Sequence, residues 1–154
     1  MIDPTATPYE QLAQAIADHL LTVPGLRTAI YPPQDYIDAA ETPAAIVYLG
    51  SGNAESRIEM DMDGGTHKPA VMVSVMVPRE GDTAQEFAKV DALIWPICKA
   101  FNDMTAVNAE VAFRPLPFHV DMCRIPQWRG ARLYTYGETR YYGADFYFDI
   151  KFHG

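Results

Sequence analysis

The chain has 154 residues and a mass of 17.2 kDa, so we expect a single domain over residues 1–154. Apolar residues make up 49% of it and charged residues 21%, as in soluble globular proteins. The formal net charge of -8 argues against a protein whose main task is to grip nucleic-acid phosphates. The sequence has no apolar run long enough to span a membrane and no signal-peptide pattern at its N-terminus, so we expect folding in a cytoplasm.

The first predicted element is a helix over residues 8–22, in the segment TPYEQLAQAIADHLL. Thr7 and Glu10 have the spacing of a capping box, and a proline occupies the first turn. Pro24 and Gly25 stop the helix. An apolar stripe at intervals of four residues predicts which side is buried: Leu12, Ile16 and Leu20.

Strands are predicted next. The apolar run 45–49 is typical of a strand buried on both faces. The segment ESRIEMDMD alternates polar and apolar residues, and AVMVSVMV alternates again after Gly64 and Gly65, so we expect a hairpin of these two segments. Alternation places four valines on one face, which we expect to lie against the helices: Val71, Val73, Val75 and Val77.

A second helix is predicted over residues 82–101, with Asp82 as its cap and a kink at Pro96. Its expected core positions follow 3-4-3-4 spacing: Phe87, Val90, Ile94, Ile97 and Phe101.

The remaining third of the chain favours β-structure. The proline-rich segment RPLPFHVDMCRIPQW indicates a long loop or an edge strand. ARLYTYGETR and YYGADFYFDIKFHG then form a predicted hairpin. Its apolar face is expected to hold Ala144, Phe146, Phe148, Ile150 and Phe152, and its polar face Asp145, Tyr147, Asp149, Lys151 and His153. The order of elements predicts an α+β fold, with two helices packed on one face of a mainly antiparallel, mixed β-sheet.

The segment EMDMDGGTHK raises the question of a metal site. An EF-hand loop that began at Asp61 would have Asp63 at position 3, but position 5 is Gly65 and position 12 is Met72, so the calcium pattern fails. Alternation explains the carboxylates as the solvent face of a strand, and Gly64 favours a turn. We therefore predict a hairpin with no structural metal and no cofactor. A small metal-dependent or hydrolytic enzyme that uses Asp61, Asp63 and His67 is an alternative.

Other patterns predict no catalytic residues. Gly50 and Gly52 give G-x-G after a strand, but the helix that a dinucleotide site needs is not predicted after them. The four histidines are scattered without metal-ligand spacing. Cys98 and Cys123 have no redox or metal spacing, and we expect two semi-buried thiols, with a disulfide between them as the alternative.

The richest stretch is CRIPQWRGARLYTYGETR, which interleaves arginines with aromatic residues. Trp, Tyr and Arg are enriched at the energetic centres of protein interfaces. With a net charge of -8, a protein interface is favoured here over a single-stranded nucleic-acid site. The candidate residues are Arg124, Trp128, Arg129, Arg132 and Tyr134.

This order of elements resembles the tail terminator proteins (tail completion or head–tail joining proteins) of long-tailed bacteriophages. The resemblance covers most of the chain as a layout: the capped first helix, the TPAAIVYL strand, the RIEMDMDGGTHKPAVMVSVMV hairpin, the 82–101 helix and the aromatic final strands. It implies a structural virion protein at the neck, without catalysis, that forms a ring of typically six subunits. The ring caps the tail tube, ends its polymerisation and provides the face to which the head docks.

The resemblance also implies partners: other copies of the chain, the tail tube protein and a head-completion or neck protein, with DNA passing through the channel without specific binding. A head-to-tail ring needs two complementary surfaces on one chain. We expect the acidic strand 55–63 to meet the basic segment 124–140 of the next subunit, or of the same subunit. The candidate interface residues of the acidic strand are Glu55, Glu59, Asp61 and Asp63. A small-molecule or peptide-binding α+β module is a further alternative.

Overall fold

The structure, a computed structural model, describes residues 2–34, 37–49, 62–63, 66–79, 81–102, 113–136 and 139–153. It describes only the backbone at residues 62, 63, 66, 131, 132 and 134. Within these ranges the chain forms helices α1 (Pro8–Leu20) and α2 (Thr83–Asn102) and a short 3-10 turn, Ala39–Glu41. The described strands are β1 (Thr28–Ile30), β2 (Ala44–Leu49), β3 (Met62–Asp63), β4 (Thr66–His67), β5 (Ala70–Pro78), β6 (His119–Tyr136) and β7 (Thr139–His153).

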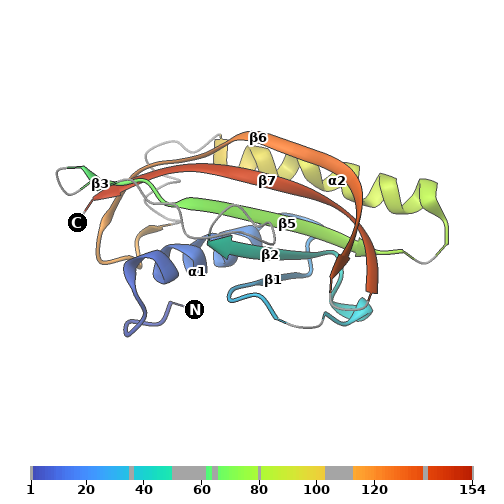
Figure 1. Cartoon of the computed structure of the whole chain (residues 1–154), viewed down its shortest axis with the longest axis horizontal. Helices are drawn as coiled ribbons and strands as arrows, with labels where there is room; N and C mark the ends of the chain where they lie inside the picture. The colour runs from blue at the N-terminus through green and yellow to red at the C-terminus, as the bar shows by residue number, and fades with distance from the viewer. Residues whose placement is uncertain are drawn as a thin grey trace.

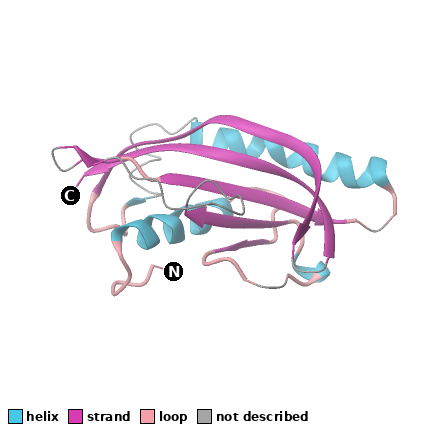
Figure 2. Ribbon diagram, in the orientation of Figure 1, coloured by secondary structure: helices cyan, strands magenta, loops and turns pink. Residues whose placement is uncertain are grey.

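The described strands form one mixed sheet (Figures 1 and 2). β1 and β2 are parallel, and the other pairs are antiparallel. The long strands β2, β5, β7 and β6 lie side by side in that order (Figure 1). His153 pairs with Thr66 of β4 and with His119 of β6, so β4 and β6 flank β7 on opposite sides. The predicted mainly antiparallel, mixed sheet is confirmed.

Both helices pack on one face of the sheet, as predicted. α1 lies along β1 and β2, and α2 lies along β6 and also contacts β5 and β7. The interior of this layer includes the four valines of β5 and, from α2, Val90, Ile94, Ile97 and Phe101. Alternation along β7 adds the expected apolar residues to the same core: Ala144, Phe146, Phe148, Ile150 and Phe152.

The first helix begins as its sequence predicts. The Thr7 side chain accepts a hydrogen bond from the Glu10 backbone N–H at 3.3 Å, and Glu10 accepts one from the Thr7 N–H at 3.1 Å. These two bonds satisfy donors that the first helical turn leaves unpaired. The helix ends at Leu20, two residues before the expected end, and Gly25 makes the following turn at a φ of 91°.

The second helix also begins as predicted, with the Asp82 carboxylate accepting a hydrogen bond from the Gln85 backbone at 3.1 Å. It continues through Pro96 to Asn102. One core prediction is wrong: Phe87 is 38% exposed. Its ring packs on Tyr142 near the tip of the β6–β7 hairpin, with a centroid distance of 4.8 Å, and the rest of it faces solvent.

The face of the sheet opposite the helices is also largely buried along β5. Met72, Ser74 and Met76 are at most 4% exposed. Asp145, expected on a polar face, is fully buried, which corrects that prediction. The Ser74 hydroxyl donates a hydrogen bond to Asp145 Oδ1 at 2.7 Å, which offsets part of the cost of burying the carboxylate.

The expected hairpin forms only at its turn. Met62 pairs with His67 and Asp63 with Thr66, so a hairpin does surround residues 64–65. β3, the described end of the 55–63 segment, does not pair with β5, contrary to expectation. The two neighbours of β5 in the sheet are β2 and β7. Pro69 lies between β4 and β5, and both strands pair with β7. Residues 55–61 lie outside the described ranges.

The proline-rich segment before the final hairpin is an edge strand from His119 onward. β6 pairs with β7, with register shifts at Val120/Met122, Arg124/Gln127 and Arg129/Arg132. Pro126 lies within the second shift, where the missing N–H of proline is tolerated on an edge strand. Of the two predicted alternatives, loop or edge strand, the structure therefore selects the edge strand.

Candidate functional site

The longest free edge among the described strands belongs to β6. This strand has 18 residues, and its described partner strand is β7. A long edge strand presents unpaired N–H and C=O groups, which natural proteins usually interrupt with bulges or cover. The three register shifts in β6 interrupt its edge in this way.

One part of the β6 edge is covered by the C-terminal end of α2. The Asn102 side chain donates a hydrogen bond to the Ile125 carbonyl at 2.9 Å and accepts one from the Ile125 N–H at 2.6 Å. The amide thus pairs both backbone groups of Ile125, as a neighbouring strand would. It ties the last turn of α2 to the middle of β6 and fixes their relative position.

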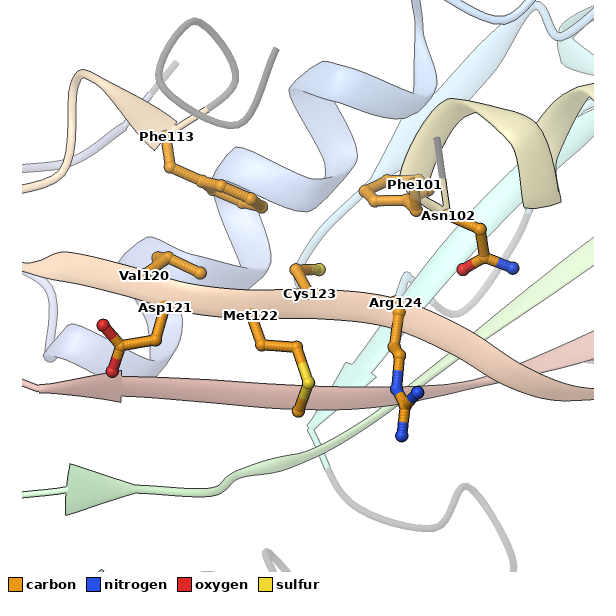
Figure 3. A pocket seen from close by; sticks show the side chains of 8 residues that line it. All are labelled: Phe101, Asn102, Phe113, Val120, Asp121, Met122, Cys123 and Arg124. Carbon is orange, nitrogen blue, oxygen red and sulfur yellow. The ribbon is translucent and has the colours of Figure 1, made fainter. Parts of the chain in front are cut away.

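A cavity of about 230 Å³ lies beside this contact, between the end of α2 and β6 (Figure 3). Phe101, Phe113 and Cys123 line its inner side, whereas Met122 and Arg124 point to the other side of the strand (Figure 3). Burial raises the pKa of the Cys123 thiol, with a smaller contribution from Asp149, and burial also raises the pKa of Cys98. Both cysteines are unpaired thiols, so the predicted thiol state is confirmed and the alternative disulfide is not formed.

Two of the predicted arginines lie on the face of β6 that points away from the helices. Arg124 donates to Asp149 Oδ2 from Nε at 3.2 Å and from Nη2 at 3.0 Å, and both side chains remain about half exposed. The Arg129 guanidinium lies over the Tyr147 ring, 5.7 Å from its centroid. Such exposed pairs contribute little stability. Asp149 neutralises the charge of Arg124, whereas Arg129 leaves a positive charge at the edge of the sheet. The side chains of Arg132 and Tyr134 lie outside the described part of the structure.

The opposite face of β6 meets α2 along an exposed apolar seam. Trp95 is 75% exposed, Trp128 47%, Leu133 44% and Phe87 38%. These four residues, which we call the apolar seam, include every exposed large apolar residue of the described chain except Leu21. Together they expose on the order of 400 Å² of side chain, a patch size that is often functional on a small protein.

The seam residues lie on the two elements that meet at the α2–β6 contact: Phe87 and Trp95 on α2, and Trp128 and Leu133 on β6. Leu133 stands opposite Tyr142 in the sheet, and Tyr142 contacts Phe87. About 10 Å further along α2, Ile94 approaches Gly130 of β6. Trp95 lies two helical turns before Asn102, whose side chain bonds β6, so Trp95 projects from the same side of α2. The interleaving of arginines with aromatic residues assigned Trp128 to a candidate interface. Helix periodicity placed Phe87 in the core and did not indicate Trp95, because periodicity predicts a buried side of a helix without showing how much of it is covered.

The acidic half of the predicted interface is only partly described. Glu55, Glu59 and Asp61 lie outside the described ranges, and Asp63 is described by its backbone in β3. β3 pairs with β4, β4 pairs with β7, and β7 pairs with β6. Three strand spacings, about 14 Å, therefore separate β3 from β6. The two ends of the predicted pair lie at opposite edges of the sheet, so β3 and β6 do not pair within one subunit.

A second group of side chains gathers at the end of the sheet near the C-terminus. The Tyr9 hydroxyl is 2.8 Å from His67 Nδ1, and the His67 ring stacks on Phe152 at 4.9 Å. These residues, with Phe118, line a cleft of about 370 Å³. His67, the histidine of the alternative enzyme hypothesis, is thus held by a hydrogen-bond contact with Tyr9 and by stacking on Phe152.

The bulge in β6 brings two further histidines to one carboxylate. Asp121 Oδ2 is 2.7 Å from His153 Nδ1, and Asp121 Oδ1 is 3.4 Å from His119 Nε2. Sequence spacing missed this group because cross-strand neighbours are 34 residues apart, at positions 119 and 153. Within the described part of the chain, no cluster of three or more ligating side chains has a geometry that would hold a metal ion.

Two comparisons bear on family membership. The sequence matches no protein-family model, and it matches no curated protein. Among the described residues, neither helix is long and apolar enough to cross a membrane. The described features that a function has to explain are the long edge strand β6, the apolar seam, and β3, the described end of the acidic segment, at the far edge.

Proposed function

We propose that this chain is a structural subunit of a ring that caps a bacteriophage tail tube. The observation that carries the proposal is that β6 and β3, the described end of the acidic segment, lie at opposite edges of one sheet. The β6 edge presents Arg124, Arg129 and Trp128, and β3, at the far edge, ends the acidic segment 55–63. A head-to-tail ring requires two different, complementary surfaces on each subunit, one on each side.

Charge complementarity in such a contact sets register and association rate more than affinity. The apolar seam beside β6 offers the area from which affinity can come. The chain as a whole carries a net charge of -8, and an acidic ring can pass DNA through its channel without holding the phosphates.

In this proposal the protein performs no chemistry and carries no cofactor. The ring, typically of six subunits, sits at the top of the tail in the virion after assembly in the host cytoplasm. One of its faces contacts the tail tube protein and the other receives the head-completion or neck protein.

Electron microscopy of tube assembly tests this function. The tail tube protein is taken from the genes that neighbour this one and polymerised with and without the purified chain. We expect the chain to form a ring at one end of each tube and to stop its growth. Tubes that elongate to the same length with and without the chain would contradict the proposal.

The cleft beside Tyr9 and His67 supports a second candidate, a small-molecule or peptide-binding module. Its volume of about 370 Å³ lies in the range of ligand pockets, and its walls are mostly aromatic. A thermal-shift screen with small aromatic ligands distinguishes the two functions. A hit that is lost in the Tyr9→Ala variant, together with unaffected tube growth, would favour this second function.

A further inference from the structure

The chain has two tryptophans, and both lie in the apolar seam. A Cβ atom built on Gly130 would lie 2.6 Å from Cζ3 of Trp128 and 3.0 Å from Cδ1 of Ile94. The Trp128 indole therefore lies over the backbone of Gly130, beside α2, in a place that only glycine leaves open. Its ring is held in position while about half of the residue faces solvent.

A side chain that is both ordered and exposed suits an interface anchor, because it loses little conformational entropy on binding. Trp95 differs, since it projects from α2 with three quarters of its surface exposed. An exposed tryptophan with no role in the fold gains the most from being covered, at about 25 cal/mol per Å² of apolar surface.

We propose that the apolar seam is the docking surface for a second copy of this chain, with Trp128 as its preset anchor and Trp95 as the residue that becomes buried. The inference rests on the ring function proposed above and assigns the residues of its subunit contact.

Charge favours a second copy as the occupant. The exposed charged positions of α2 are Lys89, Lys99 and Asp91. The helix that carries Phe87 and Trp95 thus has an exposed surface with one net positive charge, on a chain whose net charge is -8. Another copy of the chain is an acidic partner by composition, and Asp63, at the described end of its acidic segment, lies in β3 at the opposite edge of the sheet.

The area also fits a ring. A stable pairwise interface buries about 800 Å² on each partner, and the seam supplies roughly half of that. A closed head-to-tail ring gives every subunit two such contacts, so each single contact can be weaker than in an isolated dimer. The seam therefore predicts association that strengthens on ring closure.

The two tryptophans make the test direct, because emission excited selectively from tryptophan reports only on the seam. Light scattering and tryptophan emission are recorded together while the concentration of the purified chain is raised. The variants Trp128→Phe and Trp95→Phe assign the signals of Trp95 and Trp128, respectively. We expect the emission of Trp95 to shift to the blue, and its quenching by acrylamide to fall, in step with the rise in mass.

Substitutions then test the anchor. Trp95→Ala is expected to weaken association at least about tenfold, the range of interface hot spots, without changing the melting temperature of the monomer. Gly130→Ala keeps both tryptophans but forces the Trp128 indole to move, and it should weaken association as well. The matched control is Leu21→Ala, because Leu21 is 49% exposed but lies after α1, away from the seam. It should assemble as the parent does.

Each other outcome contradicts the inference in a distinguishable way. If the chain assembles while Trp95 emission and quenching stay constant, the ring stands and the seam is not its contact. The same conclusion follows if Trp95→Ala assembles as tightly as Leu21→Ala. If no oligomer forms at any soluble concentration, the seam is not a self-contact and the proposed ring function loses its basis too.

Discussion

The two helices lie on the same face of the same sheet, yet they differ in what they leave exposed. α1 buries its apolar stripe completely, with Leu12, Ile16 and Leu20 at 0% exposure. α2 buries Val90, Ile94 and Ile97 to a similar degree but leaves Phe87 and Trp95 in solvent. α1 packs over β1 and β2, whereas α2 packs mainly along the edge strand β6.

The difference shows that a helix at the edge of a sheet can pack one apolar side on the core and expose further apolar residues to solvent. α1 has one apolar side, and the fold uses all of it. α2 continues its apolar surface past the last strand, where the described chain provides no cover. The excess apolar surface of α2 is what we assign to assembly, and the predictions that follow separate the shared role of the helices from this additional one.

The largest expected effect comes from disrupting the hydrophobic core that both helices cover. Val73 is fully buried in the middle of β5, in the core that both helices cover. A carboxylate at this position has no partner and costs several kcal/mol, a large part of the total stability of a small domain. Val73→Asp should therefore abolish soluble expression and the cooperative melting transition. A variant with the parent's melting temperature would show that the assigned core is wrong.

The next effect contrasts the two helices directly. Leu12→Ala empties a fully buried site and should lower the free energy of unfolding by about 2–5 kcal/mol. Phe87→Ala removes a larger side chain, but from a partly exposed site, and should cost less than half as much. Urea denaturation of both variants measures the difference. Equal losses would mean that Phe87 belongs to the core after all.

Smaller effects should be matched at the two helix starts. Thr7 caps α1 and Asp82 caps α2, each through a hydrogen bond to a backbone N–H three residues later. Thr7→Ala and Asp82→Ala should each destabilise the fold by about 1 kcal/mol. Neither should change association, because the caps lie outside the seam. A cap variant that assembles less readily than Leu21→Ala would extend the interface beyond the seam.

The smallest effect concerns the sheet face that lies away from the helices. Burial raises the pKa of Tyr48 to about 12 from 10.0, with lesser contributions from Tyr136 and Asp145. The folded state thus favours the neutral phenol, and the associated stability is present below pH 10 and is lost as the pH rises toward 12. Tyr48→Phe should reduce the loss of stability over this interval, as measured by denaturation at a series of pH values. An unchanged slope would place the alkaline sensitivity elsewhere.

Much of the fold could be predicted because local patterns determine it. The capping box at Thr7 and Glu10 and the alternation of β5 and β7 set the elements and their buried sides. The hairpin of β6 and β7 followed from the turn between two aromatic runs, whereas the pairing of β6 back to His119 was only one of two alternatives. Those signals depend on neighbours in the sequence, so one chain suffices to detect them.

Properties that depend on distant neighbours could not be predicted. Asp145 alternates as a surface residue, yet the structure buries it beside Ser74, which is 71 residues away. Asp121 joins His119 and His153 only because a bulge turns its side chain toward them. For the candidate interface, composition indicated Trp128 and the arginines of β6, whereas Trp95 could be found only once the limit of the sheet was known.

The central claim is that subunits join head to tail, the acidic segment of one subunit against the β6 edge of the next. Light scattering at low salt, with melting curves as the control for folding, tests it most directly. The account predicts that the parent assembles, that Asp61→Arg with Asp63→Arg remains monomeric with an intact melting curve, and that adding Arg129→Glu and Arg132→Glu partly restores assembly. A charge-reversed double variant that assembles as readily as the parent would contradict the claim.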